Sequence, residues 1–420
     1  MKIVRPVTLL LLVLSLALSS AVIAQDIPKT KPEKVGLSSE RLKRIDRVLR
    51  QYVDEGQISG VTALVSRHGK IAWSGSFGMA DIENGVPMRD DAMFRICSMS
   101  KAITSTAAMI LYEEGRFLLT DPVSKYIPEF RDPLVMEPSS TGTSYALVPA
   151  KSEITIRNLL NHTSGITYGS GLQKELYDKA GMTVAITPTE GTIGEMITRL
   201  AGLPLICHPG EEFNYGMSVD ALGYLIEVIS GQPLNVFMRE RIFEPLGMDD
   251  TCFILPREKL PRVALLYSPD RNGTLVRDSV DPAYLCTRTY FSGGAGLVST
   301  ASDYWKFAQM ILNGGELNGT RILDRKSVEL MTTNSIGDLY SAFRIHSGDK
   351  FGLGFGIRTE RGEYDELESL GIIGWDGAFY TRFWIDPRED LIGIFMTQTG
   401  NWNLDLINKY RVLVYQAIVD

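Results

Sequence analysis

Hydrophobic residues near the start of the chain change from a helical to an alternating spacing. From about residue 38 to residue 55, apolar residues recur every three or four positions, which predicts an amphipathic helix that begins at a serine. Residues 61–66 and 70–75 are rich in β-branched and apolar side chains and predict two strands. The pair His68-Gly69 between these strands predicts a hairpin turn.

Later segments continue this mixture of helices and strands. Residues 102–111 carry no charge and predict a helix that is buried in the core. Residues 300–313 and 404–419 also predict helices, whereas residues 364–398 hold strands rich in Ile, Phe, Trp and Thr.

The order of these elements predicts an α/β (α+β) fold with an inserted subdomain. Strands and helices come from both chain ends, about 30–120 and 286–420. Between them, about 121–285, helical stretches alternate with loops rich in Gly, Pro and Thr. If the end segments pair into one sheet, a ligand site is expected in the cleft between the sheet and the insert.

Residues 1–24 are typical of a secretory signal, which leaves residues 25–420 as one domain. Lys2 and Arg5 precede an apolar run over residues 7–18, and Val22-Ile23-Ala24 offers acceptable residues for cleavage. We therefore expect export to a periplasm or to the medium. The rest of the sequence has no apolar run of the roughly 20 residues that a membrane-spanning helix needs.

The net charge and the histidine and cysteine content limit which classes of partner and cofactor are expected. The formal net charge of -7, without a dense Lys/Arg cluster, argues against nucleic acid or an anionic membrane as partner. The four histidines are isolated and no C-x-x-C occurs, so we expect neither a metal nor another cofactor. The sequence leaves open whether a disulfide forms among Cys207, Cys252 and Cys286, and it leaves the oligomeric state unknown.

The segment Ser98-Met99-Ser100-Lys101 carries the candidate chemistry. It opens the uncharged helix, and residues three apart share a helix face, so Ser98 and Lys101 can meet within hydrogen-bond reach. A lysine that has lost its proton in a buried pocket could accept the serine proton and activate Ser98 as a nucleophile. The neighbouring Cys97 is better explained as a small buried residue than as the nucleophile.

Tyr215 is a second candidate, in a loop between Pro209-Gly210 and a helix that begins near Ser218. A phenol beside a lysine ammonium can serve as general base, but an aromatic plug at the helix start explains the residue as well. Asp220 is explained by the first helical turn, where a carboxylate suits the helix dipole.

Three motifs in this order resemble the serine β-lactamases of class C and their relatives, the D-alanyl carboxypeptidases, D-aminopeptidases and family VIII carboxylesterases. The chain carries Ser98-Met99-Ser100-Lys101, Tyr215-Gly216-Met217 and Trp375-Asp376-Gly377 where that family has S-x-x-K, Y-x-N and K-T-G or W-G-G. Residues 154–165 and 294–300 also resemble family segments, and the resemblance runs from about Pro32 to the C-terminus. It implies a β-lactamase-like fold with an antiparallel sheet.

The resemblance also implies roles for individual residues. Ser98 is the acylated nucleophile, and Lys101 and Tyr215 share the transfer of its proton. The backbone N–H groups of Ser98 and Ala378 form the oxyanion hole. His162 lies in a recurrent family turn, where a turn-stabilising hydrogen bond is the expected role.

The third motif and the residue after Tyr215-Gly216 depart from the β-lactamase pattern. Met217, Trp375, Asp376 and Gly377 occupy positions that contact substrate in the family. A thioether and an indole cannot replace the amide and the ammonium that recognise a β-lactam, and Trp375 resembles the family VIII esterases. Asp376 either faces the cleft or is a solvated or paired charge, and the sequence leaves both orientations open.

The leading interpretation is an exported serine hydrolase that cleaves short or medium esters through an acyl-enzyme. An amide hydrolase of the β-lactamase, D-aminopeptidase or D-alanyl carboxypeptidase kind is the alternative. A relative that binds a small molecule without turnover is the second alternative. Further aromatic residues are candidates for the walls of the substrate pocket: Tyr168, Tyr177, Phe291 and Phe379.

Overall fold

A single eight-stranded sheet joins the two ends of the chain. The computed structural model describes residues 27–139, 144–184, 186–339, 349–360, 367–402 and 404–420, so the expected signal segment lies outside the described residues. Every neighbouring pair of strands in the sheet is antiparallel. In spatial order the strands are β12 (Asp349–Phe351), β13 (Gly356–Arg358), β14 (Ile373–Gly377), β15 (Thr381–Asp386), β16 (Leu391–Thr397), β1 (Gly60–Arg67), β2 (Lys70–Asp81) and β3 (Val86–Pro87).

The centre of the sheet is buried on both faces. β1 pairs with β16 from Val61↔Thr397 to Arg67↔Leu391, and all residues of both strands are buried. Along β16, Ile392 and Ile394 pack into the core on one face, whereas Phe395 packs into the core on the other. This alternation is the consequence of the two-residue period of a strand.

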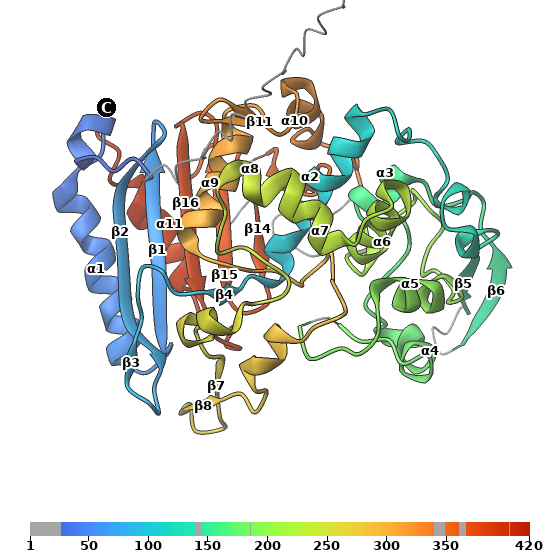
Figure 1. Ribbon diagram of the computed structural model, residues 1–420, viewed down its shortest axis with the longest axis horizontal. Helices are drawn as coiled ribbons and strands as arrows, with labels where there is room; N and C mark the ends of the chain where they lie inside the picture. The colour runs from blue at the N-terminus through green and yellow to red at the C-terminus, as the bar shows by residue number, and fades with distance from the viewer. Residues whose placement is uncertain (1–26, 140–143, 185, 340–348, 361–366, 403) are drawn as a thin grey trace, which may run out of the picture.

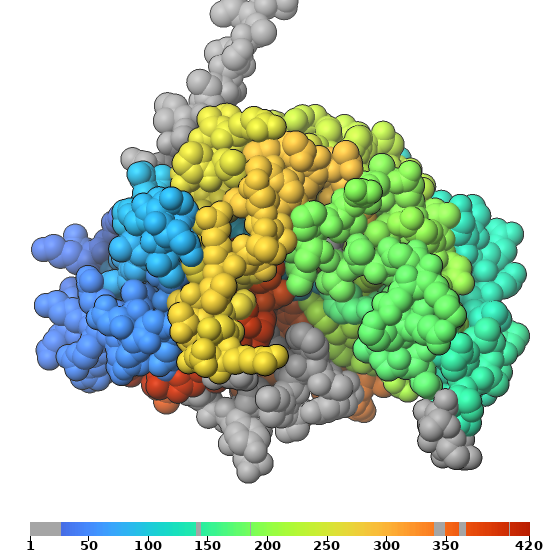
Figure 2. Space-filling view, turned by 90° about the horizontal axis from the view of Figure 1, so that it is seen from below, coloured from blue at the N-terminus to red at the C-terminus, as the bar shows by residue number. Residues whose placement is uncertain are grey.

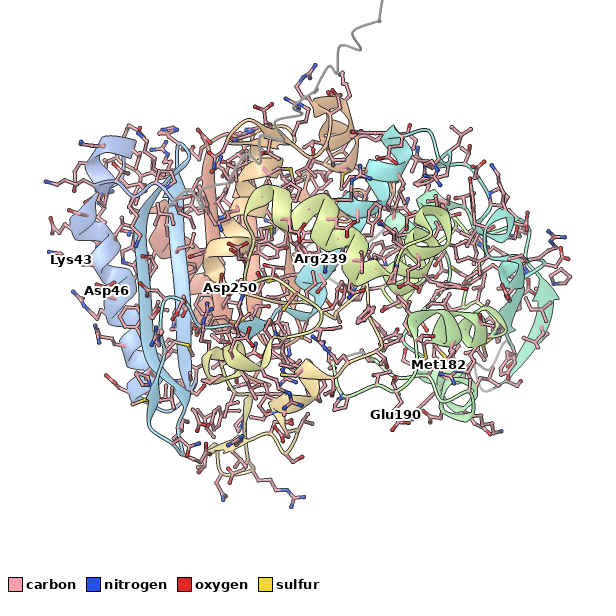
Figure 3. All side chains as sticks on the ribbon, viewed as in Figure 1. Lys43, Asp46, Met182, Glu190, Arg239 and Asp250 are labelled. Carbon is pink, nitrogen blue, oxygen red and sulfur yellow. The ribbon has the colours of Figure 1, made fainter. Side chains whose placement is uncertain are left out.

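Two helices from opposite chain ends cover one face of the sheet, as Figure 1 shows: α1 (Ser39–Asp54) and α11 (Leu406–Tyr415). The Ser38 side chain caps α1, which confirms the helix predicted from the apolar spacing. Lys43 and Asp46 both lie on α1 (Figure 3), and Lys43 is exposed. Asp46 accepts a hydrogen bond from the Trp73 indole of β2 at 2.9 Å.

The other face packs against α9 (Ala301–Leu312) and a large core shared with the insert. Helix α2 (Ser100–Glu113) lies between sheet and insert, and its residues from Ser100 to Leu111 are all buried. This confirms the buried helix that the uncharged run predicts. Among the described residues, the remaining α-helices of five or more residues are α3 (Ile156–Leu160), α4 (Lys174–Lys179), α5 (Ile193–Ala201), α6 (Ser218–Ser230), α7 (Leu234–Met238) and α10 (Arg325–Met331), and the short α8 spans Glu244–Leu246.

The central region also contains hairpins that the sequence pattern does not predict. They are β5 (Leu134–Pro138) with β6 (Tyr145–Pro149), and β7 (Tyr267–Pro269) with β8 (Leu275–Arg277). All of β6 except one partly buried residue is exposed, so the strand lacks the alternation that identifies one half-buried in a sheet. Short pairs β4 (Phe94–Arg95) with β9 (Val298–Ser299), and β10 (Glu316–Leu317) with β11 (Thr320–Arg321), complete the strands.

All four cysteines are free thiols, so no disulfide forms among Cys207, Cys252 and Cys286 in this structure. Within the described ranges, no helix has the length and apolar character required to span a membrane.

Candidate active site

Ser98 lies at the junction of sheet and insert, in a 3₁₀ turn (Cys97–Met99) that leads directly into α2. Its side chain is partly exposed, whereas Lys101, one helical turn later, is fully buried. Cys97 has φ 46°, in the left-handed region that a non-glycine residue rarely adopts. Strained backbone of this kind concentrates at functional sites.

The Lys101 ammonium connects three segments of the chain. Its Nζ donates to Ser98 Oγ at 3.2 Å, to the Tyr168 hydroxyl at 3.1 Å and to the Gly294 carbonyl at 2.8 Å. An ammonium has three N–H donors, which these contacts share with a hydrogen bond to the Tyr215 side chain.

The charge of Lys101 differs from the sequence expectation. Burial alone would lower the pKa of Lys101, but Tyr168, Tyr215 and Asp220 raise it more, and the pKa lies above its ordinary value. The resting site therefore holds a lysine cation, rather than the neutral amine that the buried helix suggests.

Tyr215 comes from the loop before α6 and lies against Lys101. The Lys101 Nζ is 4.7 Å from the centre of the Tyr215 ring, and the Trp375 indole N–H donates to the Tyr215 hydroxyl at 2.9 Å. The loop that carries Tyr215 packs closely against the backbone of Ile166 and Thr167, and Gly216 permits this because a Cβ there would overlap that backbone. The structure thus brings Ser98, Lys101 and Tyr215 into one cluster, with the Tyr215 ring only partly buried.

Asp220 is a member of the site that sequence reasoning missed. It is buried, and its Oδ1 accepts from Ser292 Oγ at 2.5 Å, from the Tyr290 hydroxyl at 3.3 Å and from the Gly294 N–H at 3.4 Å. Burial raises the pKa of this carboxyl, and Lys101 offsets part of the effect. Asp220 therefore holds the segment whose Gly294 carbonyl binds Lys101. A carboxylate in the first turn of a helix is too common for the sequence to indicate this role.

The end of β14 places Ala378 beside the turn that carries Ser98. Thr381 Oγ1 donates to the Ile96 carbonyl at 3.4 Å, and Cys97 packs with Phe379 and Ala378. Burial raises the pKa of the Cys97 thiol to about 11, so it stays protonated at neutral pH and is a poor nucleophile. This leaves Ser98 as the nucleophile candidate of the turn.

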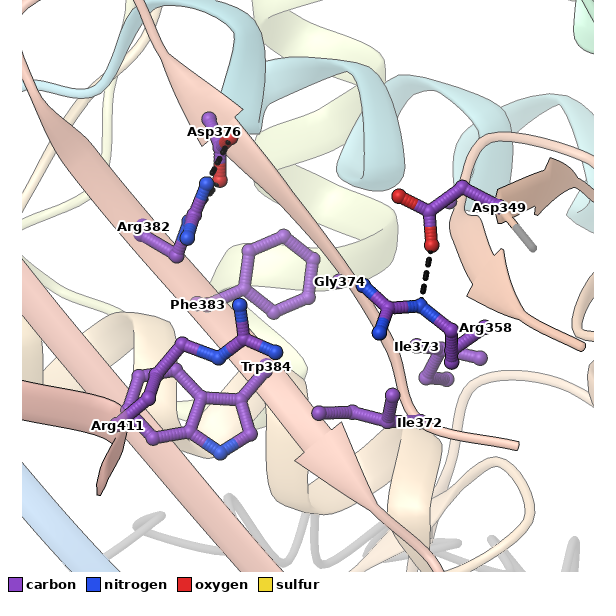
Figure 4. A pocket seen from close by; sticks show the side chains of 11 residues that line it. Asp349, Arg358, Ile372, Ile373, Gly374, Asp376, Arg382, Phe383, Trp384 and Arg411 are labelled. Carbon is purple, nitrogen blue, oxygen red and sulfur yellow. Dashed lines mark hydrogen bonds and ion pairs between the residues drawn. The ribbon is translucent and has the colours of Figure 1, made fainter. Parts of the chain in front are cut away.

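The side chains of the third motif and of Met217 are engaged by other residues of this chain. Trp375 is 2% exposed, with its indole N–H on Tyr215, and Met217 is equally buried at the start of α6. Asp376 pairs with both Nε and Nη2 of Arg382 (Figure 4), so it takes the paired orientation of the two that the sequence left open. Gly377 is buried where β14 ends.

A second group of charges lies beyond Asp376, around a cavity of about 30 Å³. There the Arg358 Nε donates to Asp349 Oδ1 at 2.5 Å (Figure 4). The Arg358 guanidinium also lies 3.3 Å from the carboxylate of Glu368. These paired charges stabilise the edge of the sheet behind the third motif, and Ser98 does not line the cavity.

One face of the molecule is hollowed between two parts of the central region of the chain. Figure 2 shows the hollow between a green surface and the later, yellow surface that precedes β9, with red surface of the C-terminal part of the chain at its floor. The strands that supply Trp375 and Gly377 belong to this late part of the chain. The hollow is therefore the expected route to the Ser98 cluster.

Two further residues differ from their sequence-based roles. Tyr168, a candidate for the pocket wall, is a hydrogen-bond partner of Lys101. The His162 ring does not supply the expected turn-stabilising hydrogen bond, because neither ring nitrogen has a partner among the described residues, whereas its backbone carbonyl accepts from Asn214 N at 2.8 Å. The Asn161 side chain holds the turn instead, accepting from Thr163 N at 3.2 Å and from Thr163 Oγ1 at 2.7 Å.

The part of the chain that the structure describes contains no group of three or more His, Cys, Asp or Glu side chains suited to a metal ion.

A family model and a relative of known description both match most of the chain. The model of the family described as "Beta-lactamase" matches residues 45–417. Esterase EstB of Burkholderia gladioli is 32% identical over 381 residues, which cover 85% of this chain and 90% of that protein.

Solved structures extend the likeness to the fold. EstCE1, described as a hydrolase with promiscuous acyltransferase activity, superposes with a TM-score of 0.78 at 27% identity, covering 90% of this chain and 99% of that one. The unliganded simvastatin synthase LovD of Aspergillus terreus, in its selenomethionyl form, gives 0.77 at 24% identity, covering 91% and 98%, and supports the fold alone.

Proposed function

The chain belongs to the Beta-lactamase family and is a serine hydrolase of that family, and from this membership we propose that it is an exported carboxylesterase that forms an acyl-enzyme on Ser98. The observation that carries the proposal is the contact of Lys101 Nζ with both Ser98 Oγ and Gly294 O inside a buried cluster that includes Tyr215. Such a cluster can activate a serine without histidine or metal.

The proposed first step is acylation. In the reactive form, the Lys101 ammonium lies beside a Tyr215 phenolate, and Tyr215 takes the Ser98 proton as Oγ attacks the ester carbonyl carbon. The Trp375 indole N–H, 2.9 Å from the Tyr215 oxygen, stabilises negative charge on that oxygen. The backbone N–H groups of Ser98 and Ala378 stabilise the oxyanion of the tetrahedral intermediate.

The remaining steps return the proton and release the acid. Tyr215 gives its proton to the leaving alcohol oxygen as the carbonyl–oxygen bond breaks, which leaves the acyl group on Ser98. Water then attacks the acyl carbon while Tyr215 accepts a proton from the water, and Tyr215 passes this proton to Ser98 Oγ as the acyl–oxygen bond breaks and the acid leaves. Lys101 stays charged throughout and holds the Ser98 and Tyr215 side chains in their relative positions.

Esters of short or medium acids are the proposed substrates. At the third motif an indole stands where class C β-lactamases carry a lysine, and its N–H is committed to Tyr215. The adjacent Asp376 is neutralised by Arg382, and Met217 is buried and apolar. None of these three side chains offers a cation to a substrate carboxylate, which favours a neutral ester over an anionic β-lactam.

Turnover of a short-chain p-nitrophenyl ester tests the proposal, with a chromogenic cephalosporin as parallel substrate. Ser98→Ala is expected to abolish ester hydrolysis, whereas Ser100→Ala, which removes the hydroxyl that accepts from Leu297 N at 3.2 Å, retains it. Cephalosporin turnover is expected to be negligible. Equal ester rates in wild type and Ser98→Ala would contradict the assignment of the nucleophile.

We also propose export through the signal at residues 1–24. Expression of the full chain in a bacterium with an export system, followed by N-terminal sequencing, tests it. A protein that begins near Gln25 in the periplasm or medium is the expected result, and an uncleaved cytoplasmic protein would contradict it.

A further inference from the structure

His162 is fully buried, and in the described part of the chain neither Nδ1 nor Nε2 has a hydrogen-bond partner. Buried polar atoms are almost always paired, because a polar group that loses water without a replacement costs free energy. The turn around His162 does not need the imidazole, since Asn161 supplies its side-chain hydrogen bonds. The ring therefore needs another explanation.

The His162 ring packs among three aromatic rings, one of which belongs to the candidate site. Its centre is 4.7 Å from that of Tyr215, 5.3 Å from that of Phe351 and 5.8 Å from that of Phe213. The Tyr215 contact has the shortest of these distances. Tyr215 is thus supported on its ring by His162 and at its hydroxyl by the Trp375 indole.

The backbone of His162 is tied to the same loop. Its carbonyl accepts from Asn214 N at 2.8 Å, in the residue before Tyr215. His162 also has φ 58°, in the left-handed region. Histidine is several-fold enriched there compared with most residues that carry a Cβ, whereas bulky apolar residues are outliers. The position combines two requirements, an aromatic ring against Tyr215 and a left-handed backbone.

We propose that His162 is a positioning residue for Tyr215. Its imidazole ring fixes the plane of the phenol against Lys101, and its backbone fixes the loop that carries the phenol. The inference rests on the proposed function only in assigning proton transfer to Tyr215. His162 does not touch the Ser98 hydroxyl through any hydrogen bond, so its effect on the reaction passes through Tyr215.

Two substitutions separate the two requirements. His162→Asn keeps a residue suited to the left-handed backbone and removes the ring. His162→Phe keeps a ring of similar size and removes the backbone preference and the nitrogens. If the ring positions Tyr215, activity follows the ring and thermal stability follows the backbone.

The measurements are kcat, KM and Tm for both variants on the p-nitrophenyl ester, together with the rate at which a fluorophosphonate labels Ser98. We expect His162→Asn to lower kcat and the labelling rate about 10- to 100-fold with KM within about threefold, since a small displacement of a catalytic group has effects of this size. His162→Phe is expected to keep kcat within about threefold of wild type while its Tm falls.

A purely structural role predicts the opposite pattern. Unchanged kcat in folded His162→Asn, or a kcat that follows Tm in both variants, would overturn the proposal. If His162→Phe does not fold, His162→Gln takes its place as a second ringless variant, and full activity in either folded ringless variant overturns the proposal. Ser98→Ala, measured in parallel, tests the proposed function separately. If the wild type hydrolyses no ester, the fluorophosphonate labelling rate still decides the role of His162.

Discussion

The hydrogen bond from the Trp375 indole to Tyr215 gives a quantitative prediction for Trp375→Phe. The indole is 2% exposed and its Nε1 lies 2.9 Å from the Tyr215 oxygen. Phenylalanine keeps an aromatic ring beside Tyr215 and Phe351, whose ring centres are 5.3 and 5.0 Å from that of Trp375, and removes only the donor and part of the volume.

The magnitude follows from the charge on Tyr215 during acylation. A hydrogen bond to a charged group contributes about 1.5–3 kcal/mol. Its loss raises the free energy of the reactive phenolate form relative to the resting phenol and therefore lowers kcat roughly 10- to 150-fold. The smaller ring also leaves a cavity, so we expect a loss of unfolding free energy of about 1–3 kcal/mol.

Trp305→Phe is the matched control. Trp305 donates its indole N–H to Ser66 Oγ at 2.6 Å and is 3% exposed, but its partner is on β1 and outside the Ser98 cluster. It should lose stability and keep kcat. Steady-state kinetics on the p-nitrophenyl ester, at a temperature where urea unfolding shows all proteins folded, give the comparison. A Trp375→Phe kcat within twofold of wild type, or equal losses in both variants, would refute the reasoning.

Three further predictions concern stability and the oxyanion turn. Asp220→Leu leaves three donors without their acceptor and should lower the urea-measured free energy of unfolding by about 3 kcal/mol or more. Asp220→Asn keeps an oxygen acceptor and should lose less than half of that. Equal losses in the two variants would contradict this account. Burial, with a smaller effect of Lys101, holds the pKa of His162 well below its ordinary value, so below about pH 6.5 the unfolded chain binds a proton that the folded chain does not. This destabilisation is absent above that pH. Between pH 7.5 and 5.5 the free energy of unfolding in urea should therefore fall by about 1.4 kcal/mol more for wild type than for His162→Phe. Identical losses would show that His162 takes up a proton in the folded protein. A Cβ in Gly377→Ala would overlap the Ile96 carbonyl, so we expect a loss in kcat of about 100-fold from a displaced Ala378 N–H, with Gly202→Ala as a tolerated control whose Cβ has 3.5 Å to its nearest atom; a kcat equal to that of the control would contradict a role for this turn.

The elements with strong periodicity could be predicted from sequence. The helix capped by Ser38 and the hairpin at His68-Gly69 form as expected, because local spacing and turn chemistry decide them. The β5–β6 hairpin could not be predicted, because its second strand is almost entirely exposed. Its pairing depends on contacts that no local pattern encodes.

Some features of the candidate site could likewise be predicted from sequence, and others could not. The positions of Ser98 and Lys101 follow from helix geometry, since three residues place both side chains on one face. The charge on Lys101 does not follow, because Tyr168 and Asp220 are distant in sequence and reach it only through the fold. The same holds for Asp376, whose orientation depends on its pairing with Arg382 across β14 and β15.

The pairing of β1 with β16 governs how the chain can fold. Val61 and Thr397 are neighbours in the sheet although roughly 330 residues separate them along the chain. A ribosome has therefore made nearly all of the polypeptide before the central strand can find its partner, and until then its apolar face stays uncovered. Loss of the last thirty residues would remove both β16 and α11 and leave β1 as an open edge. Premature termination near the C-terminus should consequently yield aggregates rather than a shortened enzyme, and chaperones that bind extended apolar segments should improve the yield of the intact chain.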